Sequence, residues 1–563
     1  MRKHRSSMIV ICLCFLIILF FPSTHAVAAK QLEFWVSPQG NTAVGAVSPD
    51  IACWYSEKDK QYYLLLPAMV DASRLTIHFT QVDTMSIGGL TLRPGDVTKV
   101  FVPGKTLNVQ TKNGKYKLSV LQSANVPAIW IETLNGSLKA IHAKKTNRET
   151  ADMLMLSPNG NTVYQGSLEH FRGRGHASFA FDKKPYQIKL TVSTDLLGYG
   201  KAKKWILLAM FTDYSLLRNT IAFDMAADAG LPYSPNNAHI DLYIDREYKG
   251  TYLLCDKIEI GKTRVSIPDL EKNTEALNDK PLSEYKRVGK NNYTKNSIKG
   301  YQIPNEPDDI SGGYILELEY QKRYPEGSSG FVTKRGQAVV LSEPKYASQA
   351  QVETVRKQMQ AFENAIFSKN GIDTDSGKHY SQIMDMNSLT RKFVIEEILK
   401  NYDASKSSQY FYKPADSEST LLFAGPVWDY DSSLGNFAPE HNKKFFEPEY
   451  FCAATDTAMP FYIWSALYKQ ADFYETAVNV YHEVYKPLLR VLLGQEPGTG
   501  RLRSLDAYYQ HIQGTAHLNF IRWPMATNRK LRINPGPKYW DQIAQLDNFI
   551  TRRELFLDKE WKR

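Results

Sequence analysis

Two aspartates that lie close together are the strongest chemical signal in this sequence. Asp429 and Asp431 occur in the run from Val427 to Asn436, whose other residues are mostly apolar or small. A third carboxylate, Asp403, follows a helical pattern upstream, in Lys-Asn-Tyr-Asp-Ala-Ser. Hard cations such as Mg²⁺ bind a few carboxylates together with substrate phosphates. The arrangement therefore predicts that the three acids gather around a divalent cation, and it predicts a phosphoryl-transfer reaction.

A basic turn rich in glycine is the first candidate for binding the phosphates. The segment Phe171-Arg-Gly-Arg-Gly175 contains Arg172, Arg174 and Gly175. Glycine lets backbone amides approach an anion closely, and arginine can donate two parallel hydrogen bonds. We expect these three residues to contact a nucleotide. The alternative is a tight turn with solvated arginines.

A lysine-rich segment at the start of a predicted strand is the second candidate for binding the phosphates. In Lys183-Lys-Pro-Tyr-Gln-Ile-Lys189, a lysine on the strand could reach nucleotide phosphates. Strand alternation places Lys189 on the face of Lys183 and directs Lys184 to the other face. We predict that Lys184 and Lys189 bind the nucleotide. A solvated strand start is the competing interpretation.

A helix start supplies the third candidate. The segment from Asp213 to Asn219 is expected to open a helix capped by Ser215 or Asp213, with Arg218 and Asn219 in its first turn. Either residue could orient the nucleotide or an acidic group. A buried arginine paired with a carboxylate is the structural alternative for Arg218.

Acidic residues on two further strand-like blocks could pair with these lysines. Asp256 follows Tyr-Leu-Leu-Cys, and Glu317 lies in Gly-Gly-Tyr-Ile-Leu-Glu-Leu-Glu. A lysine–glutamate pair positions the phosphates in kinases. Asp256 and Glu317 are therefore candidate lysine partners, unless they are solvent-facing acids on strand edges.

Composition restricts the partners. The 563 residues carry a net charge of +10, which favours anionic partners such as nucleotides, acidic proteins or wall polymers. No basic block or recognised module indicates nucleic acid. Outside the N-terminal segment, the chain has three scattered cysteines, Cys53, Cys255 and Cys452. They form neither a disulfide framework nor a zinc motif, so we expect buried free thiols.

The N-terminus has the layout of a secretory signal peptide. Basic residues precede an apolar run from Met8 to Phe21, and small residues follow up to Ala29. We predict a cleaved signal over residues 1–29 and a secreted, cell-envelope or spore-associated protein. The alternative is an uncleaved membrane anchor. The rest of the sequence contains no apolar run long enough to span a membrane, so no stable span is expected after cleavage.

The sequence indicates an α+β fold with a small all-β module first. Residues 30–130 contain strand-like runs at 62–66, 75–79 and 116–120 between turn residues, which predicts a β-sandwich. Residues 131–343 are mixed, with strands at 129–133 and 186–190, a helix over 214–229 and a hairpin over 240–254. The polar stretch 269–311 is expected to be a mobile insertion without secondary structure.

The chain becomes mainly helical after residue 343. Apolar residues spaced three and four apart predict helices over 352–366 and 387–400, the second capped by Asp385 or Asn387. Short strands are expected at 409–412 and 421–423. A last helix is predicted over 539–561, with Trp540, Ile543, Leu546 and Ile550 on one face.

Six sequence blocks in this order resemble the CotH kinase family, named for spore coat protein H, an atypical, secretory-type protein kinase. The blocks are Gly-Arg-Gly, Lys-Lys-Pro-Tyr-x-Ile-Lys-Leu, Lys-Lys-Trp-x-Leu-Leu-Ala, Ser-Leu-Leu-Arg-Asn, Gly-Gly-Tyr-Ile-Leu-Glu and Trp-Asp-Tyr-Asp-x-x-x-Gly-Asn. They run from about Phe171 to Asn436, and flanking segments extend the resemblance to about residues 130–560.

The resemblance implies a remote protein-kinase-like catalytic domain with a helical C-terminal part. Such an enzyme transfers the γ-phosphoryl group of ATP, with Mg²⁺ or Mn²⁺, to Ser or Thr of a surface or spore-coat protein. Asp403 matches the catalytic acid of the family, and Asp429 matches its metal-binding acid, with Asp431 expected as a second metal ligand. Arg174 and Lys184 would offset the charge that develops on the transferred group.

Three positions depart from the expected patterns. Ser408 stands where a protein kinase has a metal-binding Asn, His176 follows Gly-Arg-Gly where the family often has Asn, and Asp256 replaces a longer acid. The alternative function is a catalytically inactive CotH-like structural or binding protein. A metal-dependent phosphohydrolase or nucleotidyl transferase would need similar acids.

Overall fold

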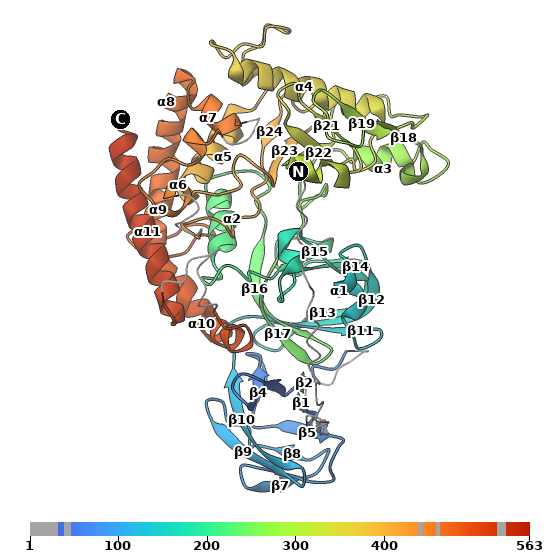
Figure 1. Ribbon diagram of the computed structural model, residues 1–563, viewed down its shortest axis with the longest axis vertical. Coiled ribbons are helices and arrows are strands. Elements are labelled where there is room, and N and C mark those ends of the chain that lie inside the picture. The colour runs from blue at the N-terminus through green and yellow to red at the C-terminus, as the bar shows by residue number, and fades with distance from the viewer. Residues whose placement is uncertain (1–31, 39–46, 437–442, 458–461, 526–535) are drawn as a thin grey trace, which may run out of the picture.

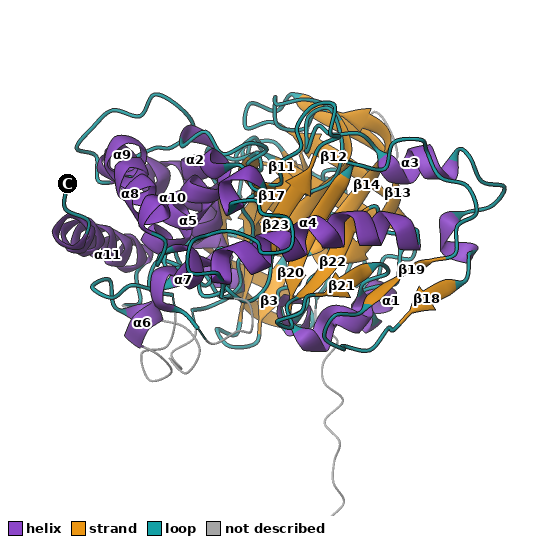
Figure 2. Cartoon of the chain, turned by 90° about the horizontal axis from the view of Figure 1, so that it is seen from above, coloured by secondary structure: helices purple, strands orange, loops and turns teal. Residues whose placement is uncertain are grey.

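The computed structural model describes residues 32–38, 47–436, 443–457, 462–525 and 536–563. The predicted signal peptide, residues 1–29, lies outside this part of the chain. Of the helices in the described ranges, none has both the length and the apolar character needed to cross a membrane. The architecture is α+β, as predicted, with several sheets and a set of helices gathered mainly on one side of the strands (Figure 2).

Two sheets form the N-terminal region at one end of the molecule (Figure 1). The first has the order β2 (Ile51–Ala52), β1 (Phe34–Pro38), β5 (Leu75–Phe79), β8 (Val97–Thr98). The second has the order β3 (Trp54–Ser56), β4 (Gln61–Leu66), β10 (Gly114–Gln122), β9 (Thr106–Thr111), β6 (Met85–Ile87), β7 (Leu90–Leu92). The predicted strands at 62–66, 75–79 and 116–120 are confirmed. Alternate residues of β1 and β5 are buried in one apolar cluster that both sheets share, the packing of a β-sandwich.

This sandwich packs against the next part of the chain. Its apolar cluster also includes Trp130 and Tyr243, whose rings stack with centroids 5.1 Å apart. The Tyr243 hydroxyl donates a hydrogen bond to the carbonyl of Leu65 at 2.9 Å. The sandwich is therefore joined to the following barrel by a common core.

A closed barrel follows, with the strand order β11, β12, β13, β14, β15, β17, β16. These strands are β11 (Ala128–Thr133), β12 (Glu149–Leu156), β13 (Thr162–Gly173), β14 (Tyr186–Thr194), β15 (Ala202–Leu208), β16 (Asn237–Ile244) and β17 (Glu247–Asp256). Helix α1 (Lys139–Ala143) lies between β11 and β12, and α2 (Arg218–Asp228) between β15 and β16. The predicted strands at 129–133 and 186–190 and the hairpin over 240–254 are confirmed. Apolar side chains from the strands fill the interior.

The predicted helix over 214–229 begins later than expected, at Arg218. The carboxylate of Asp213 accepts hydrogen bonds from the backbone amides of Ser215 and Arg218, at 3.0 Å each. Leu216 has a φ of 59°, which is incompatible with a helix. The first four residues therefore form a turn around the Asp213 side chain instead of a helical turn.

The second large sheet has the order β18 (Arg287–Gly289), β19 (Ile298–Tyr301), β21 (Gly330–Val332), β22 (Ala338–Glu343), β20 (Tyr314–Glu319), β23 (Gln409–Lys413), β24 (Phe423–Ala424). The expectation that 269–311 lacks secondary structure is wrong. This stretch contains helix α3 (Leu270–Glu275), capped by the Asp269 side chain, and strands β18 and β19. Polar composition hid these elements because their anchors include the buried Lys299, whose ammonium donates to the carbonyls of Tyr324 and Gly327.

Helices dominate the rest of the described chain. They are α4 (Gln349–Phe367), α5 (Met386–Leu399), α6 (Lys443–Phe446), α7 (Ile463–Leu467), α8 (Ala471–Val480), α9 (Lys486–Leu492), α10 (Leu505–Arg522) and α11 (Tyr539–Glu560). Asp385 caps α5, as predicted, by accepting from the Ser388 amide at 2.7 Å. Ile543, Leu546 and Ile550 of α11 are buried, but Trp540 is 47% exposed, so its predicted place on that face is wrong.

A buried ion pair ties the last helix to the centre of the molecule. The guanidinium of Arg553 in α11 donates to the Glu397 carboxylate of α5 at 2.6 Å and to the carbonyls of Pro448 and Tyr450. Both side chains of the pair are almost fully buried. Among the described residues, Cys53, Cys255 and Cys452 are free and buried, as expected.

We predict that Arg553→Ala lowers the free energy of unfolding by about 3–5 kcal/mol, because it leaves the Glu397 charge buried without its partner. The neighbouring Arg552 provides a matched control, since its pair with Glu449 is exposed and Arg552→Ala should cost under about 1 kcal/mol. Urea denaturation followed by far-ultraviolet circular dichroism measures both values. Equal losses in the two variants would contradict this account.

Candidate active site

A cleft of about 890 Å³ lies between the barrel and the second large sheet. The barrel contributes residues of β13 to β15, the sheet contributes residues of β20 and β22, and the chain segments after α5 and β24 complete the lining. Nine of the predicted site residues line it: Arg172, Arg174, Gly175, Lys189, Asn219, Glu317, Asp403, Asp429 and Asp431. Lys184, Arg218 and Asp256 lie outside the lining. The cleft therefore brings together segments that are far apart in the sequence.

The three aspartates are positioned by short, irregular segments. Helix α5 ends at Leu399, Lys400 adopts a left-handed conformation, and the chain turns so that Asp403 faces the cleft. The Tyr320 hydroxyl lies 3.4 Å from a carboxylate oxygen of Asp403. Ser408 donates from its hydroxyl to the Asp429 carboxylate at 3.2 Å. The position that departs from the kinase pattern thus lies directly beside the predicted metal ligand.

Asp429 and Ser408 both have strained backbones. Their φ angles are 66° and 56°, in the left-handed region that residues other than glycine rarely occupy. Such conformations cost about 1–3 kcal/mol each and cluster at functional sites. The amide of Tyr430, the next residue, donates to the Asn219 side chain at 2.9 Å, which helps to hold this turn.

The carboxylates repel one another. Burial, with repulsion from Asp431, raises the pKa of Asp403 to about 6. Burial, with repulsion from Asp431 and Asp403, raises the pKa of Asp429 to about 8. A divalent cation would relieve this repulsion, so the donor set fits a hard metal ion. In the described ranges, however, no three His, Cys, Asp or Glu side chains converge into a complete metal site. The residues fit a cation that phosphate oxygens also coordinate.

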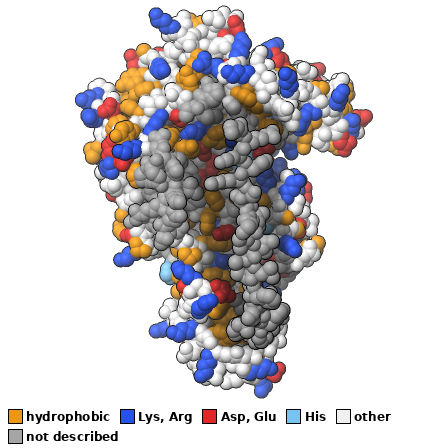
Figure 3. Space-filling model, viewed as in Figure 1, with side chains coloured by type: hydrophobic (Ala, Val, Ile, Leu, Met, Phe, Trp, Pro, Cys, Tyr) orange, Lys and Arg blue, Asp and Glu red, His pale blue; other side chains and the backbone are white. Residues whose placement is uncertain are grey.

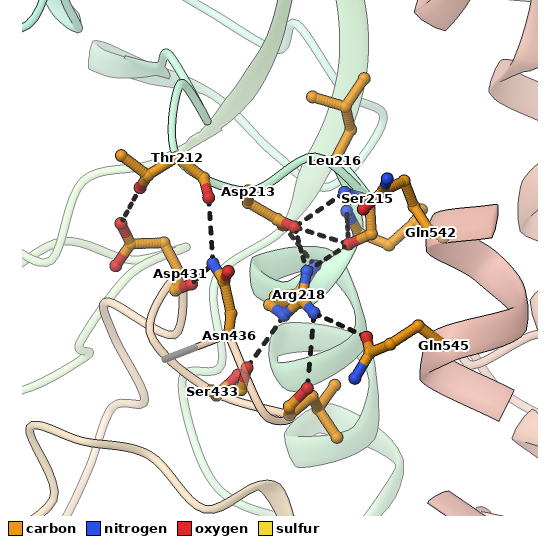
Figure 4. A network of polar contacts seen from close by, with 12 residues as sticks. Thr212, Asp213, Ser215, Leu216, Arg218, Asp431, Ser433, Asn436, Gln542 and Gln545 are labelled. Atoms are coloured by element: carbon orange, nitrogen blue, oxygen red, sulfur yellow. Dashed lines mark hydrogen bonds and ion pairs between the residues drawn. The ribbon is translucent and has the colours of Figure 1, made fainter. Parts of the chain in front are cut away.

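The loop after Asp429 is held by a buried arginine (Figure 4). Arg218, at the start of α2, donates from Nε to the carbonyl of Ser433 at 2.9 Å and from Nη2 to Gln545 at 3.1 Å. It also forms an ion pair with Asp213, and both side chains are almost fully buried. Arg218 therefore has the structural role named above as the alternative, a buried arginine paired with a carboxylate, because neither it nor these partners line the cleft.

The same loop also positions the Asp431 side chain. The Asp431 carboxylate accepts a hydrogen bond from the Thr212 hydroxyl at 3.1 Å (Figure 4). The Asn436 side-chain amide donates to the carbonyl of Asp431 at 2.6 Å and to the carbonyl of Thr212 at 3.0 Å. Asn436 explains why the motif ends in asparagine: its amide closes the loop against the segment after β15. Thr212 was missed by the sequence reasoning, although it directly precedes the Asp213 motif.

The glycine-rich turn places one arginine in the same cleft as the acids. The Arg174 guanidinium lies over the Trp428 ring, 5.3 Å from its centroid. Its positive charge partly offsets the rise in the pKa of Asp429 that burial and the neighbouring aspartates cause. Gly175 has a φ of 91°, which favours glycine. Arg172 is engaged with Gln187 at 2.7 Å. Burial and the neighbouring charges of Arg148 and Arg174 lower the pKa of Arg172 to about 10. Arg174 is therefore the arginine best placed to contact an anion in the cleft.

The two lysines predicted to bind the nucleotide, Lys184 and Lys189, differ in whether they line the cleft. Lys189 lines the cleft and pairs with Glu169. The ammonium of Lys184 donates to the carbonyls of Phe179 at 2.9 Å and Phe181 at 3.0 Å. Strand β14 begins only at Tyr186, so alternation does not extend back to Lys184, which instead stabilises the preceding turn.

The two candidate lysine partners also differ. Asp256 forms an ion pair with Arg264 at 2.9 Å and lines another cavity. Glu317 lies in the cleft, where burial and repulsion from Glu319 raise its pKa to about 7. Arg174, not a lysine, is the cation whose charge acts on Glu317.

Further cations line the cleft: Lys145, Arg148, Lys204 and Arg323. Lys204 lies in β15, within one of the six quoted sequence blocks, but it was not singled out as a site residue. The other three gave no sequence signal because they lie in short polar segments. Elsewhere Lys and Arg are scattered over the described part of the visible surface without a single basic block (Figure 3). The cleft is thus lined by both carboxylates and cations, and Lys145 pairs with Glu326 at 3.0 Å. A lining of both signs suits an anion bound together with a metal ion.

We predict that Asp429→Asn raises the free energy of unfolding by about 1 kcal/mol or more when divalent cations are removed, because it abolishes the repulsion from Asp431 and Asp403. Asparagine tolerates the left-handed backbone at this position. Thermal unfolding in a chelating buffer measures the change. Asp182→Asn, at an exposed aspartate, is the control and should leave the melting temperature unchanged. A lower melting temperature for Asp429→Asn would refute the repulsion.

Comparison with known proteins supports one family. No curated protein matches the chain. The family model described as "CotH kinase protein" matches residues 170–557, more than half of the chain and all of the cleft-forming motifs from the glycine-rich turn to Asn436. The blocks quoted above lie within this match in the expected order. The chain therefore belongs to the CotH kinase family.

Proposed function

We propose that this protein is a secreted, atypical protein kinase that transfers the γ-phosphoryl group of ATP to a Ser or Thr hydroxyl of a surface or spore-coat protein. The observation that carries the proposal is the cleft itself, which Asp403, Asp429, Asp431 and Arg174 line together, with Arg174 close enough to act on the charge of Asp429. Family membership supports a kinase-like function and a spore-coat association. The cleft between the barrel and the second sheet would correspond to the cleft between the two lobes of a kinase-like fold.

Asp403 is the proposed catalytic base. It would accept the proton of the acceptor hydroxyl while the hydroxyl oxygen forms a bond to the γ-phosphorus. The bond between the γ-phosphorus and the bridging oxygen breaks, and its electron pair leaves with ADP. A pKa of about 6 suits this role, because a base is most effective when its pKa lies near the working pH.

Asp429 and Asp431 are the proposed holders of Mg²⁺ or Mn²⁺, with Ser408 beside Asp429. The bound ion would supply neutralisation of charge on the phosphate oxygens. Arg174 would orient the transferred group, and Glu317 would position Arg174 from the opposite side of the cleft. Asn219 acts through the backbone of the Asp429 turn, so we assign it a positioning role.

Nucleotide binding is tested by thermal unfolding with ATP, in the presence and absence of Mg²⁺ or Mn²⁺. A ligand at about 100 times its dissociation constant stabilises the folded state by about 2.7 kcal/mol. We expect a metal-dependent stabilisation by ATP that Asp429→Asn and Arg174→Gln abolish and Asp182→Asn preserves. Equal stabilisation of all four proteins would contradict binding in this cleft.

Catalysis is tested by following labelled γ-phosphate from ATP into protein. We expect Asp403→Ala to lower incorporation at least ~100-fold, the usual contribution of a general base, while ATP binding is kept. Asp182→Ala is the matched control and should retain the parent rate. Nucleotide binding without incorporation into the protein itself or into coat extracts would favour an inactive, structural member of the family. Free labelled phosphate as the main product would indicate a phosphohydrolase.

A further inference from the structure

A buried ion pair on α5 contacts the turn that carries Asp429 and Asp431. Lys392 and Glu396 are one helical turn apart on α5, and both residues are 0% exposed. Removing two charges from water is unfavourable, and apolar residues of the same shape often stabilise a core as well or better. In some proteins such a pair is retained because it fixes one specific geometry. The geometry that this pair fixes is that of its contact with Tyr430.

The contact between the ion pair and the turn is a hydrogen bond. The Tyr430 hydroxyl donates to Oε1 of Glu396 at 2.6 Å and lies 3.4 Å from the Lys392 ammonium. The tyrosine is buried like the pair, so water does not compete for these contacts. Within the described ranges, Oε2 of Glu396 has no hydrogen-bond partner, and the Tyr430 hydroxyl is the donor that reaches Oε1 from outside α5.

Tyr430 is held at both ends. Its amide donates to the Asn219 side chain of α2 at 2.9 Å, and its hydroxyl reaches α5. The residue between the two aspartates is therefore fixed relative to both helices, which limits where the flanking carboxylates can point. This restraint matters because the left-handed backbone of Asp429 persists only when its surroundings hold it. Helix α5 also leads into the segment of Asp403, so the same helix is connected to all three acids of the cleft.

We propose that Glu396, oriented by Lys392, is a positioning residue for the metal ligands. It accepts the hydrogen bond of the Tyr430 hydroxyl and thereby holds Asp429 and Asp431 at the spacing that a divalent cation requires. The inference rests on the proposed function, in which these two aspartates hold the cation. Neither member of the ion pair lines the cleft, so both act through Tyr430. Residues that orient metal ligands without touching the metal contribute a factor of about 10–100 to its affinity.

The test is calorimetric titration of the full chain with the Mn²⁺–ATP complex. Tyr430→Phe removes only the hydroxyl, and we expect it to weaken binding about tenfold, the lower end of the range for such residues. The matched control is Tyr485→Phe, because the Tyr485 hydroxyl is also buried and donates to the carbonyl of Arg391 in α5 at 2.9 Å. Both variants lose one buried hydrogen bond at α5, so urea denaturation should show similar losses of stability. Only Tyr430→Phe should lose affinity for Mn²⁺–ATP.

Two double variants separate the hydrogen bond from the charges. Each removes both charges of the ion pair together and therefore leaves no unpaired charge in the core. Lys392→Met/Glu396→Gln retains an acceptor for the Tyr430 hydroxyl and should bind Mn²⁺–ATP as the parent does. Lys392→Met/Glu396→Leu lacks the acceptor and should weaken binding to the same degree as Tyr430→Phe. Adding Tyr430→Phe to the second double variant should cause no further loss, because both changes remove the same interaction.

The outcomes distinguish this inference from the proposed function. Binding by the parent that is unchanged in Tyr430→Phe, or that falls equally in Tyr430→Phe and Tyr485→Phe, would overturn the positioning role alone. Equal affinities of the two double variants would do the same, because they differ only in the acceptor for the Tyr430 hydroxyl. Absence of Mn²⁺–ATP binding by the parent would overturn the proposed function and this inference with it.

Discussion

The buried guanidinium of Arg218 is the interaction on which the geometry of the cleft depends. It joins the first turn of α2 to the loop after Asp429, through the carbonyl of Ser433 and the carboxylate of Asp213. A charge so deeply buried is tolerated only when its hydrogen bonds are satisfied, and here carbonyls, a carboxylate and Gln545 satisfy them. The loop is thereby fixed to the barrel side of the molecule, although its sequence is more than 200 residues away.

That fixed loop explains how strained residues persist at the site. The left-handed backbones of Asp429 and Ser408 are unfavourable on their own, and so is the close approach of Asp403, Asp429 and Asp431. Hydrogen bonds at the cleft wall, from the Tyr430 amide to Asn219 and from Asn436 to the carbonyl of Thr212, compensate for these costs. The fold thus stores unfavourable charge where a cation and an anion together would remove it.

The sequence was most informative where a local pattern decides the structure. Alternation identified β4, β5 and the β16–β17 hairpin, and three- and four-residue spacing identified α4, α5 and α11. Prediction failed where a side chain takes over the hydrogen bonds of a helical turn, as the Asp213 carboxylate does before α2. It also failed where a buried polar side chain such as Lys299 holds a polar segment in place.

The candidate site shows the same limit. The motifs in the sequence predicted that Asp403, Asp429, Asp431 and Arg174 share one site, and all four line the cleft. The sequence could not distinguish the cations that line the cleft, Arg174 and Lys189, from those with a structural role, Arg218 and Lys184. Residue type alone does not reveal which cation is already hydrogen-bonded to backbone carbonyls. Only three-dimensional contacts make that distinction.

The buried thiols have a consequence for how the protein withstands its surroundings. Cys53, Cys255 and Cys452 are unpaired, and burial raises the pKa of the Cys452 thiol to about 12, so the reactive thiolate is scarce. These cysteines form no cross-link among the described residues, so their contribution to stability comes from packing in the core. Each thiol becomes reactive only when the core around it opens. Alkylation of Cys53 therefore reports opening of the sandwich core, and alkylation of Cys255 reports opening of the large core that the barrel strands share with the helices.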